Sequence, residues 1–364
     1  MRREIGRGII ILLFSLLLSG QNCYGITEIK LEKEPLHLTK SHPHIQGNSV
    51  VFDKGIVDRV DLDLYLSLFN EMTIEQGKEF SDLFVFGTVA PGFTIHFKDK
   101  KTRAGFLYSF TRELDYNDFW EKVSGLYLEH DILPNQHIAI GVRRRLPIGY
   151  EGSLSSVKHP FFIRSQIGRT FGNVYGFGLN NTAQYKYLDY DIGVYDGSRF
   201  MNKLFDGSEF AGMVQFKPLA HFEDKFGKLK LGASIDNGNQ HGAFNVFGAH
   251  AVYEYKKLYL DFEYANANGY TRGKVNPSEI DGFYTTLGWN ITDKLRILGR
   301  YDYLKNRTID RSAREYSGGL SYFLRPGLEF MVNYVLVDSG WERELQHKIY
   351  LGTRFNLGEF ANNL

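Results

Sequence analysis

The stretch RVDLDLYLSLF, residues 59–69, decides the fold class of this chain. Its apolar and polar residues alternate, with Leu62, Leu64, Leu66 and Leu68 set between Asp61, Asp63, Tyr65 and Ser67. Successive side chains of a β-strand point to opposite faces, so the leucines share one face and the carboxylates share the other. The stretch therefore predicts a strand with one apolar and one charged face.

The same alternation recurs along the rest of the chain. In KLYLDFEY, residues 257–264, Leu258, Leu260 and Phe262 alternate with Tyr259, Asp261 and Glu263. A period of two over this length is the main sequence signal for a strand. It predicts about sixteen strands, at 58–69, 82–97, 103–112, 121–131, 136–145, 173–181, 185–195, 208–218, 227–236, 243–255, 257–267, 279–291, 294–304, 313–324, 327–337 and 346–357.

The connections between the predicted strands alternate in length. Those after even-numbered strands are mostly short, as at 256–257 and 292–293. Those after odd-numbered strands are longer and more polar, and residues 146–172 form the longest. This arrangement predicts an up-and-down meander with its short turns at one end, as in outer-membrane barrels with periplasmic turns and extracellular loops.

Three features favour a barrel in a membrane over a soluble sheet. The predicted strands are mostly longer than the soluble mode of about five to six residues and approach the nine to eleven that cross a bilayer. Aromatic residues lie at the ends of the apolar faces, at Tyr253, Tyr255, Trp289, Tyr301 and Tyr303. The third feature is an export signal before a mature chain with no cysteine. In lipid a sheet must close on itself to satisfy its backbone. We therefore expect an all-β, transmembrane, antiparallel up-and-down barrel of about 16 strands; a soluble secreted β-sandwich or β-helix is the alternative.

The first 25 residues have the pattern of a secretory signal peptide. Arg2, Arg3 and Arg7 precede the apolar run IIILLFSLLL, residues 9–18, which is too short to span a bilayer. Removal of residues 1–25 also removes Cys23, the only cysteine, and changes the net charge from +1 to −1. A disulfide framework is thereby excluded, and nothing in the charge favours a nucleic-acid partner.

Residues 26–56 do not alternate, and we expect a periplasmic N-terminal segment or linker there, followed by the barrel over 57–364. The segment holds His37, His42 and His44, which we interpret as part of a polar linker and not as a metal site. No cofactor is expected. Phe360 lies four residues before the C-terminus and is the candidate for the aromatic signal that the barrel assembly machinery reads.

The long connection at 146–172 is unusually apolar, with Phe161, Phe162 and Ile167 among its residues. Apolar side chains of this kind are expected to pack against other parts of the protein. We therefore predict that the connection, which is the third loop of the barrel, folds inward. The alternation around Ile140 places Arg143 and Arg145 on the lumen face of the preceding strand.

The sequence of this region resembles the phosphate-selective porin O and P family. The similarity extends over about 60 residues and rests on four motifs within them: GVRRRLPIGYE (141–151), SLSS (153–156), FFIRS (161–165) and YDIGVYDGSRF (190–200). The resemblance implies uptake of anions through a basic constriction. Glu151 is the one acid of the loop, and we interpret it as a loop anchor. The implied constriction residues are Arg143, Arg145, Lys158, Arg164 and Arg169, and Arg296, Arg300 and Arg354 are further lumen-facing bases.

The sequence thus predicts an outer-membrane porin, not an enzyme. It would be a passive diffusion channel for small hydrophilic solutes, with a preference for anions, phosphate among them. The lumen faces of all strands together carry a mixed set of charges, so this preference rests on the constriction. The expected partners are the lipid bilayer, lipopolysaccharide, the assembly machinery and two further copies in a homotrimer. An outer-membrane barrel without a transport role, structural, adhesive or lipid-modifying, is the alternative.

Overall fold

The computed structural model describes residues 44–75, 81–110, 122–144, 149–154, 158–172, 175–196, 207–239, 242–270, 278–340 and 345–361. These residues all belong to one compact unit, Pro43–Leu364. The expected signal peptide, with Cys23, and the histidines at 37 and 42 lie outside the described residues. No helix in the described ranges is long and apolar enough to cross a membrane.

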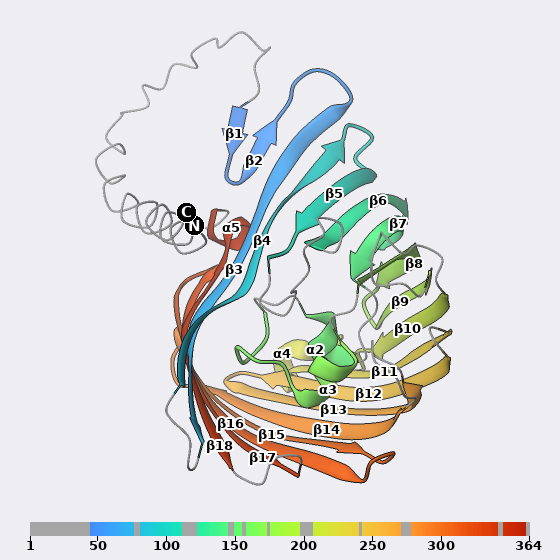
Figure 1. Ribbon diagram of the computed structural model, residues 1–364. Coiled ribbons are helices and arrows are strands. Elements are labelled where there is room, and N and C mark those ends of the chain that lie inside the picture. Colours follow the sequence, from blue (N-terminus) through green and yellow to red (C-terminus); the bar gives the residue numbers. More distant parts are fainter. Residues whose placement is uncertain are drawn as a thin grey trace, which may run out of the picture. The chain divides into compact units, whose positions relative to one another are not determined.

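Within the described residues, sixteen antiparallel strands follow one another around a closed barrel (Figure 1). Each strand pairs with the next in sequence, and β18 pairs with β3 to close the ring. The predicted up-and-down barrel of about 16 strands is confirmed. The strands are β3 (Val57–Glu75), β4 (Ser81–Phe97), β5 (Thr102–Tyr108), β6 (Val123–Leu133), β7 (Gln136–Arg144), β8 (Tyr175–Gln184), β9 (Leu188–Tyr195), β10 (Ser208–Phe216), β11 (Lys228–Asn239), β12 (Ala243–Tyr255), β13 (Leu258–Tyr270), β14 (Ser278–Asn290), β15 (Leu295–Asn306), β16 (Arg311–Arg325), β17 (Leu328–Ser339) and β18 (Gln346–Asn356).

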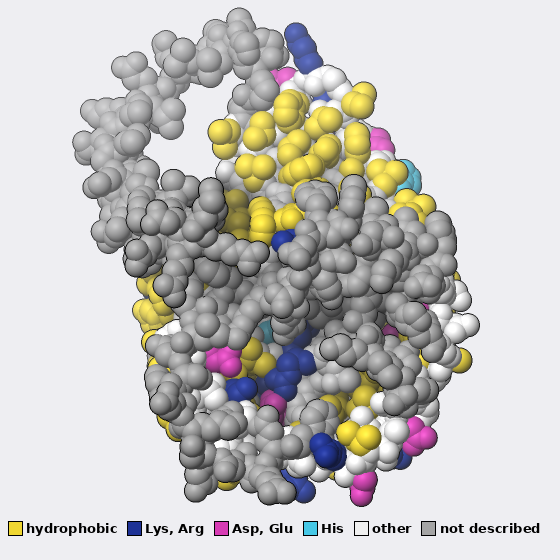
Figure 2. Space-filling view, viewed as in Figure 1, with side chains coloured by type: hydrophobic (Ala, Val, Ile, Leu, Met, Phe, Trp, Pro, Cys, Tyr) yellow, Lys and Arg dark blue, Asp and Glu magenta, His cyan; other side chains and the backbone are white. Residues whose placement is uncertain are grey.

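The barrel has the reverse polarity of a soluble protein. On β13, Leu260 and Phe262 point outward and are 38% and 40% exposed, whereas Asp261 and Glu263 point inward and are fully buried. In Figure 2, hydrophobic side chains gather over the part of the surface that β3 to β5 form. An outer surface of this kind suits hydrocarbon, because its many apolar side chains would be unfavourable in water.

The two ends of the barrel differ in their connections. Lys256 and Lys257 alone join β12 to β13, and a two-residue turn also joins β16 to β17. The short-turn end carries one longer connection, residues 217–227, which contains α4 (Glu223–Phe226). β3 begins and β18 ends at this end, and short turns face the periplasm in outer-membrane barrels.

Residues that we expected in the N-terminal linker extend the sheet. β1 (His44–Gln46) and β2 (Ser49–Val51) form a hairpin, and β2 pairs with β3 at Arg59–Asp61, beyond the point where β18 ends. The boundary expected at residue 57 therefore lies earlier within the described chain. After β18 the chain forms α5 (Leu357–Ala361), where the ring of Phe360 lies 5.4 Å from that of Phe355.

Candidate functional site

The connection between β7 and β8 lies inside the barrel. Its two short helices, α2 (Gly149–Ser153) and α3 (Gln166–Thr170), lie within the ring of strands in Figure 1. Four of its backbone N–H groups donate to inward-facing side chains of the wall. These bonds run from Gly149 to Ser234 (3.2 Å), from Glu151 to Glu263 (3.1 Å), from Phe162 to Asn333 (2.8 Å) and from Gln166 to Asp302 (2.7 Å). We call residues 149–154 and 158–172 the constriction loop.

Apolar side chains attach the loop to the same wall. Ile167 and Phe171 are buried in a cluster with Tyr270, Tyr284 and other residues of β12 to β15. Phe162 packs in a second cluster, with its ring 5.0 Å from that of Phe69. Full burial of such a side chain contributes about 1.5–3 kcal/mol, so these contacts explain why the loop is apolar.

Glu151 links both halves of the loop to β15. Its carboxylate is 1% exposed and accepts from the backbone N–H of Ser165 (2.8 Å), from the Ser165 hydroxyl and from Arg300 Nη1 (3.2 Å). Ser165 is also the N-cap of α3, because its Oγ accepts from the Gly168 N–H at 3.0 Å. These contacts are those of a loop anchor.

The inward-facing arginines Arg300 and Arg354 contact the loop backbone. Arg300 donates to the carbonyl of Ile163 (3.1 Å) and lies over the Phe161 ring at 4.7 Å. Arg354 donates to the carbonyls of His159 and Phe161, and its guanidinium is 5.1 Å from the centre of the Phe162 ring. Both are nearly fully buried, so they hold the loop and do not line open water.

The five expected constriction bases lie in different places. Arg169 pairs with Glu315 at 2.6 Å, and Arg164 donates to the carbonyl of Glu151 at 3.0 Å. Lys158 is more exposed and pairs with Glu359 of α5 at 3.2 Å, which places it at the short-turn end. Arg143 is the last residue but one of β7, but its side chain and the whole of Arg145 lie outside the described residues.

Two adjoining cavities, of about 390 and 260 Å³, lie between the loop and the short-turn rim. Arg296 lines both, with its Nε 2.8 Å from Asn290 Oδ1 and its guanidinium over the Phe323 ring. We call the two together the basic groove. Its charged lining consists of the bases Lys158, Lys256, Lys257 and Arg296 and the acids Glu254 and Asp293. In Figure 2, Lys and Arg side chains also gather in an opening on the viewed face.

Sequence reasoning missed two of these bases. Lys256 and Lys257 were interpreted only as a tight turn, and the turn is real, because Lys256 has a φ of 52°. The occurrence of two adjacent lysines in a two-residue turn was the feature from which these bases could have been predicted. A turn residue at the rim can project its charge over the pore mouth, but strand alternation does not predict the direction of turn side chains.

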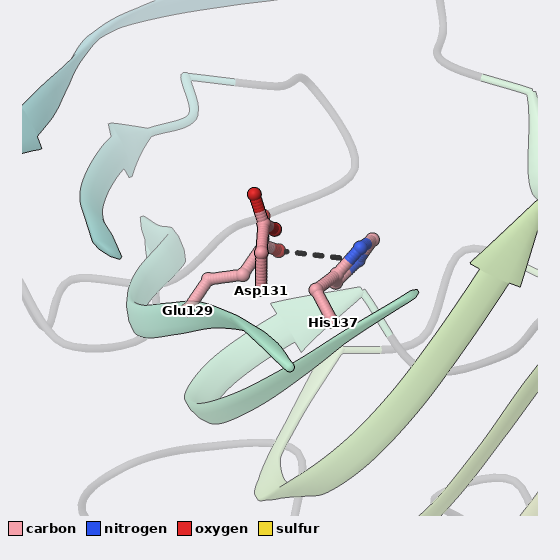
Figure 3. Close-up of side chains that lie close together, drawn as sticks. All are labelled: Glu129, Asp131 and His137. Atoms are coloured by element: carbon pink, nitrogen blue, oxygen red, sulfur yellow. Dashed lines mark ion pairs between the residues drawn. The ribbon is translucent and has the colours of Figure 1, made fainter. Parts of the chain in front are cut away.

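A mixed group of charges lies on β5 to β7 (Figure 3). Glu129, Asp131 and His137 come close enough together to hold a metal ion, and His137 Nε2 lies 3.3 Å from Glu129 Oε2. Arg103, however, already pairs with both carboxylates, at 2.5 Å from Glu129 and 2.7 Å from Asp131. A metal would have to displace that guanidinium, so the group has the chemistry of an ion-pair network and not of a metal site.

Comparison with known proteins gives one family and a common fold. The sequence profile of the phosphate-selective porin O and P family matches residues 227–351. No curated protein sequence matches the chain. The matched segment covers β11 to β17 and most of β18 together with the basic-groove residues at 254–257, 290–293 and 296, but it does not include the constriction loop.

Several solved porin and channel structures share the fold. The anion-selective porin from Comamonas acidovorans superposes with a TM-score of 0.61 at 11% identity, covering 82% of this chain and 99% of that one. The outer membrane channel DcaP of Acinetobacter baumannii has a TM-score of 0.60 at 9% identity, covering 83% and 98%. OmpT of Vibrio cholerae, in a form lacking loop L8, has a TM-score of 0.58 at 14% identity, covering 82% and 99%. At such identities the likeness establishes the fold alone.

Proposed function

We propose that the chain is an outer-membrane porin, because the profile of the phosphate-selective porin O and P family matches residues 227–351, and that it passes small hydrophilic solutes passively, with a preference for anions. The chain acts in this proposal as a channel and not as an enzyme. Phosphate is one candidate solute among small anions.

The basic groove carries the proposal of anion preference. Four bases and two acids line it, in a confined space beside the constriction loop, and because Lys158 pairs with Glu359, the excess of positive charge rests on Lys256, Lys257 and Arg296. A local excess of positive charge between low-dielectric walls raises the concentration of anions and lowers that of cations. In this proposal the sequence-derived bases Arg143, Arg145 and Arg164 add to the positive field, whereas the contact of Arg169 with Glu315 reduces its contribution.

The remaining partners follow from the porin fold. We propose a homotrimer, because one of the similar structures is described as a trimer form of OmpT from Vibrio cholerae. Export through the signal peptide, insertion by the barrel assembly machinery and contact with lipopolysaccharide belong to the same proposal. The apolar outer face, with Leu260 and Phe262 exposed, supports the bilayer as the surrounding medium.

Planar-bilayer recording in a salt gradient tests the anion preference. The parent protein is expected to give an open channel whose reversal potential has the sign of anion selectivity. A groove variant, Lys158→Gln with Lys256→Gln and Arg296→Gln, should move that potential towards zero, and the anion-to-cation permeability ratio should fall several-fold. A constriction variant, Arg143→Ala with Arg145→Ala and Arg164→Ala, tests the sequence-derived set in the same measurement.

A matched control removes three positive charges elsewhere. Lys54, Lys225 and Lys305 lie outside the groove lining, and their replacement by glutamine should leave the potential unchanged. If neither the groove variant nor the constriction variant differs from this control, the anion assignment is wrong. A folded barrel that gives no current at all would instead favour a structural role.

A further inference from the structure

Tyr284, Asp261 and Glu263 are buried beneath the constriction loop, and the tyrosine hydroxyl lies within hydrogen-bond distance of both carboxyl groups. If both carboxyl groups were ionised, the tyrosine hydroxyl would hold the one hydrogen available for two contacts. Tyr284 Oη lies 2.9 Å from Asp261 Oδ2 and 2.8 Å from Glu263 Oε2, and all three side chains are 0% exposed. A tyrosine hydroxyl has one hydrogen and can donate to only one of the two oxygens. The other contact is a hydrogen bond only if that carboxyl group carries a proton and donates it to the tyrosine oxygen.

The surrounding charges favour the same conclusion. Glu151 and Asp302 are also buried, and the guanidinium of Arg300 lies 3.2 Å from the first and 4.0 Å from the second. Asp261 Oδ1 and Glu263 Oε1 make no hydrogen bond within the described residues. A buried carboxylate without a counter-charge is costly, and retention of a proton removes that cost. One shared proton between Asp261 and Glu263 would therefore account for both contacts with Tyr284.

The first turn of the constriction loop rests on this pair. The Glu151 N–H donates to Glu263 Oε2, and the Gly149 N–H donates to Ser234 Oγ at 3.2 Å. Gly149 has a φ of +76°, and a Cβ there would lie 1.5 Å from Glu263 Oε1. Only glycine fits between the turn and the carboxyl group, so the backbone of α2 lies directly against Glu263.

We propose that the proton shared by Asp261 and Glu263 positions the constriction loop, and that its loss at alkaline pH loosens α2 from the wall. Loss of that proton would raise the charge of the pair from −1 to −2, beside the Glu151 carboxylate. The single hydrogen of the Tyr284 hydroxyl would then serve only one of the two carboxylates that contact it. Attachment of the loop should therefore weaken when the pair loses its proton. Glu263 and Asp261 are positioning residues in this proposal.

Other titratable groups around the pair have to be distinguished from it. They are Tyr259 on the same strand, Tyr150 and Glu151 on α2, His250 on β12, Tyr284 on β14, and Arg300 and Asp302 on β15. An imidazole ordinarily titrates near pH 6.5, on the acid side of the expected change. Amide replacement of either carboxyl group identifies the source of an alkaline transition.

A nitroxide on the loop measures its attachment without any need for ion conduction. Ser153 is exposed at the end of α2, and Cys23 is the only native cysteine, so Ser153→Cys with Cys23→Ser gives one labelling site. Spectra of the folded protein in detergent are recorded from about pH 5 to about pH 10, which spans the range reported for buried carboxyl groups. The mobile component is expected to rise several-fold at the alkaline end.

Glu263→Gln should abolish that rise. The glutamine amide donates to Tyr284 in place of the acid proton, and its carbonyl still accepts from the Glu151 N–H. Asp261→Asn also places an amide donor beside the Tyr284 hydroxyl, and it should likewise abolish the rise in the mobile component. Asp63→Asn, at an inward-facing acid of β3 that contacts Thr94, is the control and should titrate like the parent. A parent loop that keeps one mobility over the whole range, or a Glu263→Gln loop that still titrates, would overturn the proposal, whether or not the protein conducts anions.

Discussion

Arg354 shows how a single buried residue holds the constriction loop. It is 2% exposed and donates to two carbonyl groups of the loop, those of His159 and Phe161. We expect Arg354→Lys to weaken this attachment by about 1–3 kcal/mol, because an ammonium group cannot bridge two carbonyls as a planar guanidinium does and one is left without its donor. Single-channel recording should show greater open-channel noise at the same mean conductance. Arg314→Lys, at an exposed pair with Asp338, should leave the noise unchanged.

Strand alternation predicts which face a residue occupies but not what it contacts there. The inward direction of Arg300 and Arg354 followed from their position in an alternating strand, and both are indeed inside. Their partners are loop residues more than 130 positions earlier in the chain, and no local pattern encodes such a contact. The same reason explains why the cluster of Asp261, Glu263 and Tyr284 was not foreseen.

The constriction loop is an element that can be removed without breaking the sheet. Arg144 of β7 and Tyr175 of β8 are paired, so residues 145–148 and 171–174 suffice to join the two strands after deletion of 149–170. The loop occupies lumen space, and its deletion is expected to raise single-channel conductance roughly twofold or more. A heat-modifiable band on gels would verify that the barrel is folded. Unchanged conductance in a folded barrel would show that the loop does not narrow the pore.

The strands were predicted well where the pattern is long and regular. The segment expected at 243–255 is β12 with the same limits, because its alternation is uninterrupted. The first strand was expected to end at residue 69, yet β3 continues to Glu75. β3 and β4 pair with a register shift at this point, because Ser67 lies opposite Thr88 and Leu68 lies opposite Phe86, which leaves Gly87 as an extra residue in β4. β1 and β2 have three residues each, too few for a period to be recognised.

At the scale of the whole molecule, closure follows from the requirements of lipid and not from any one strand. A period of two is equally compatible with an open sandwich, and it was the need to satisfy every backbone group in hydrocarbon that favoured a ring. The pairing of β18 with β3 joins residues almost 300 positions apart, from Tyr65–Glu75 to Gln346–Asn356. Any residue that obstructs this contact should affect assembly of the entire barrel.

Gly352 lies where the ring closes. A Cβ at this position would be 2.1 Å from the carbonyl oxygen of Leu68 and 2.6 Å from Phe69 Cα, both backbone atoms of β3 that cannot move aside without shifting the strand. We therefore expect Gly352→Ala to destabilise the closed barrel by about 1–3 kcal/mol or more, through overpacking at the seam. The folded fraction and the temperature of heat modification on gels, measured after refolding into detergent, should both fall. Gly318→Ala on β16 is the matched control, because a Cβ there meets nothing within 4 Å, and it should refold and melt like the parent. Equal behaviour of the two variants would mean that the strands approach less closely at the seam than they do here.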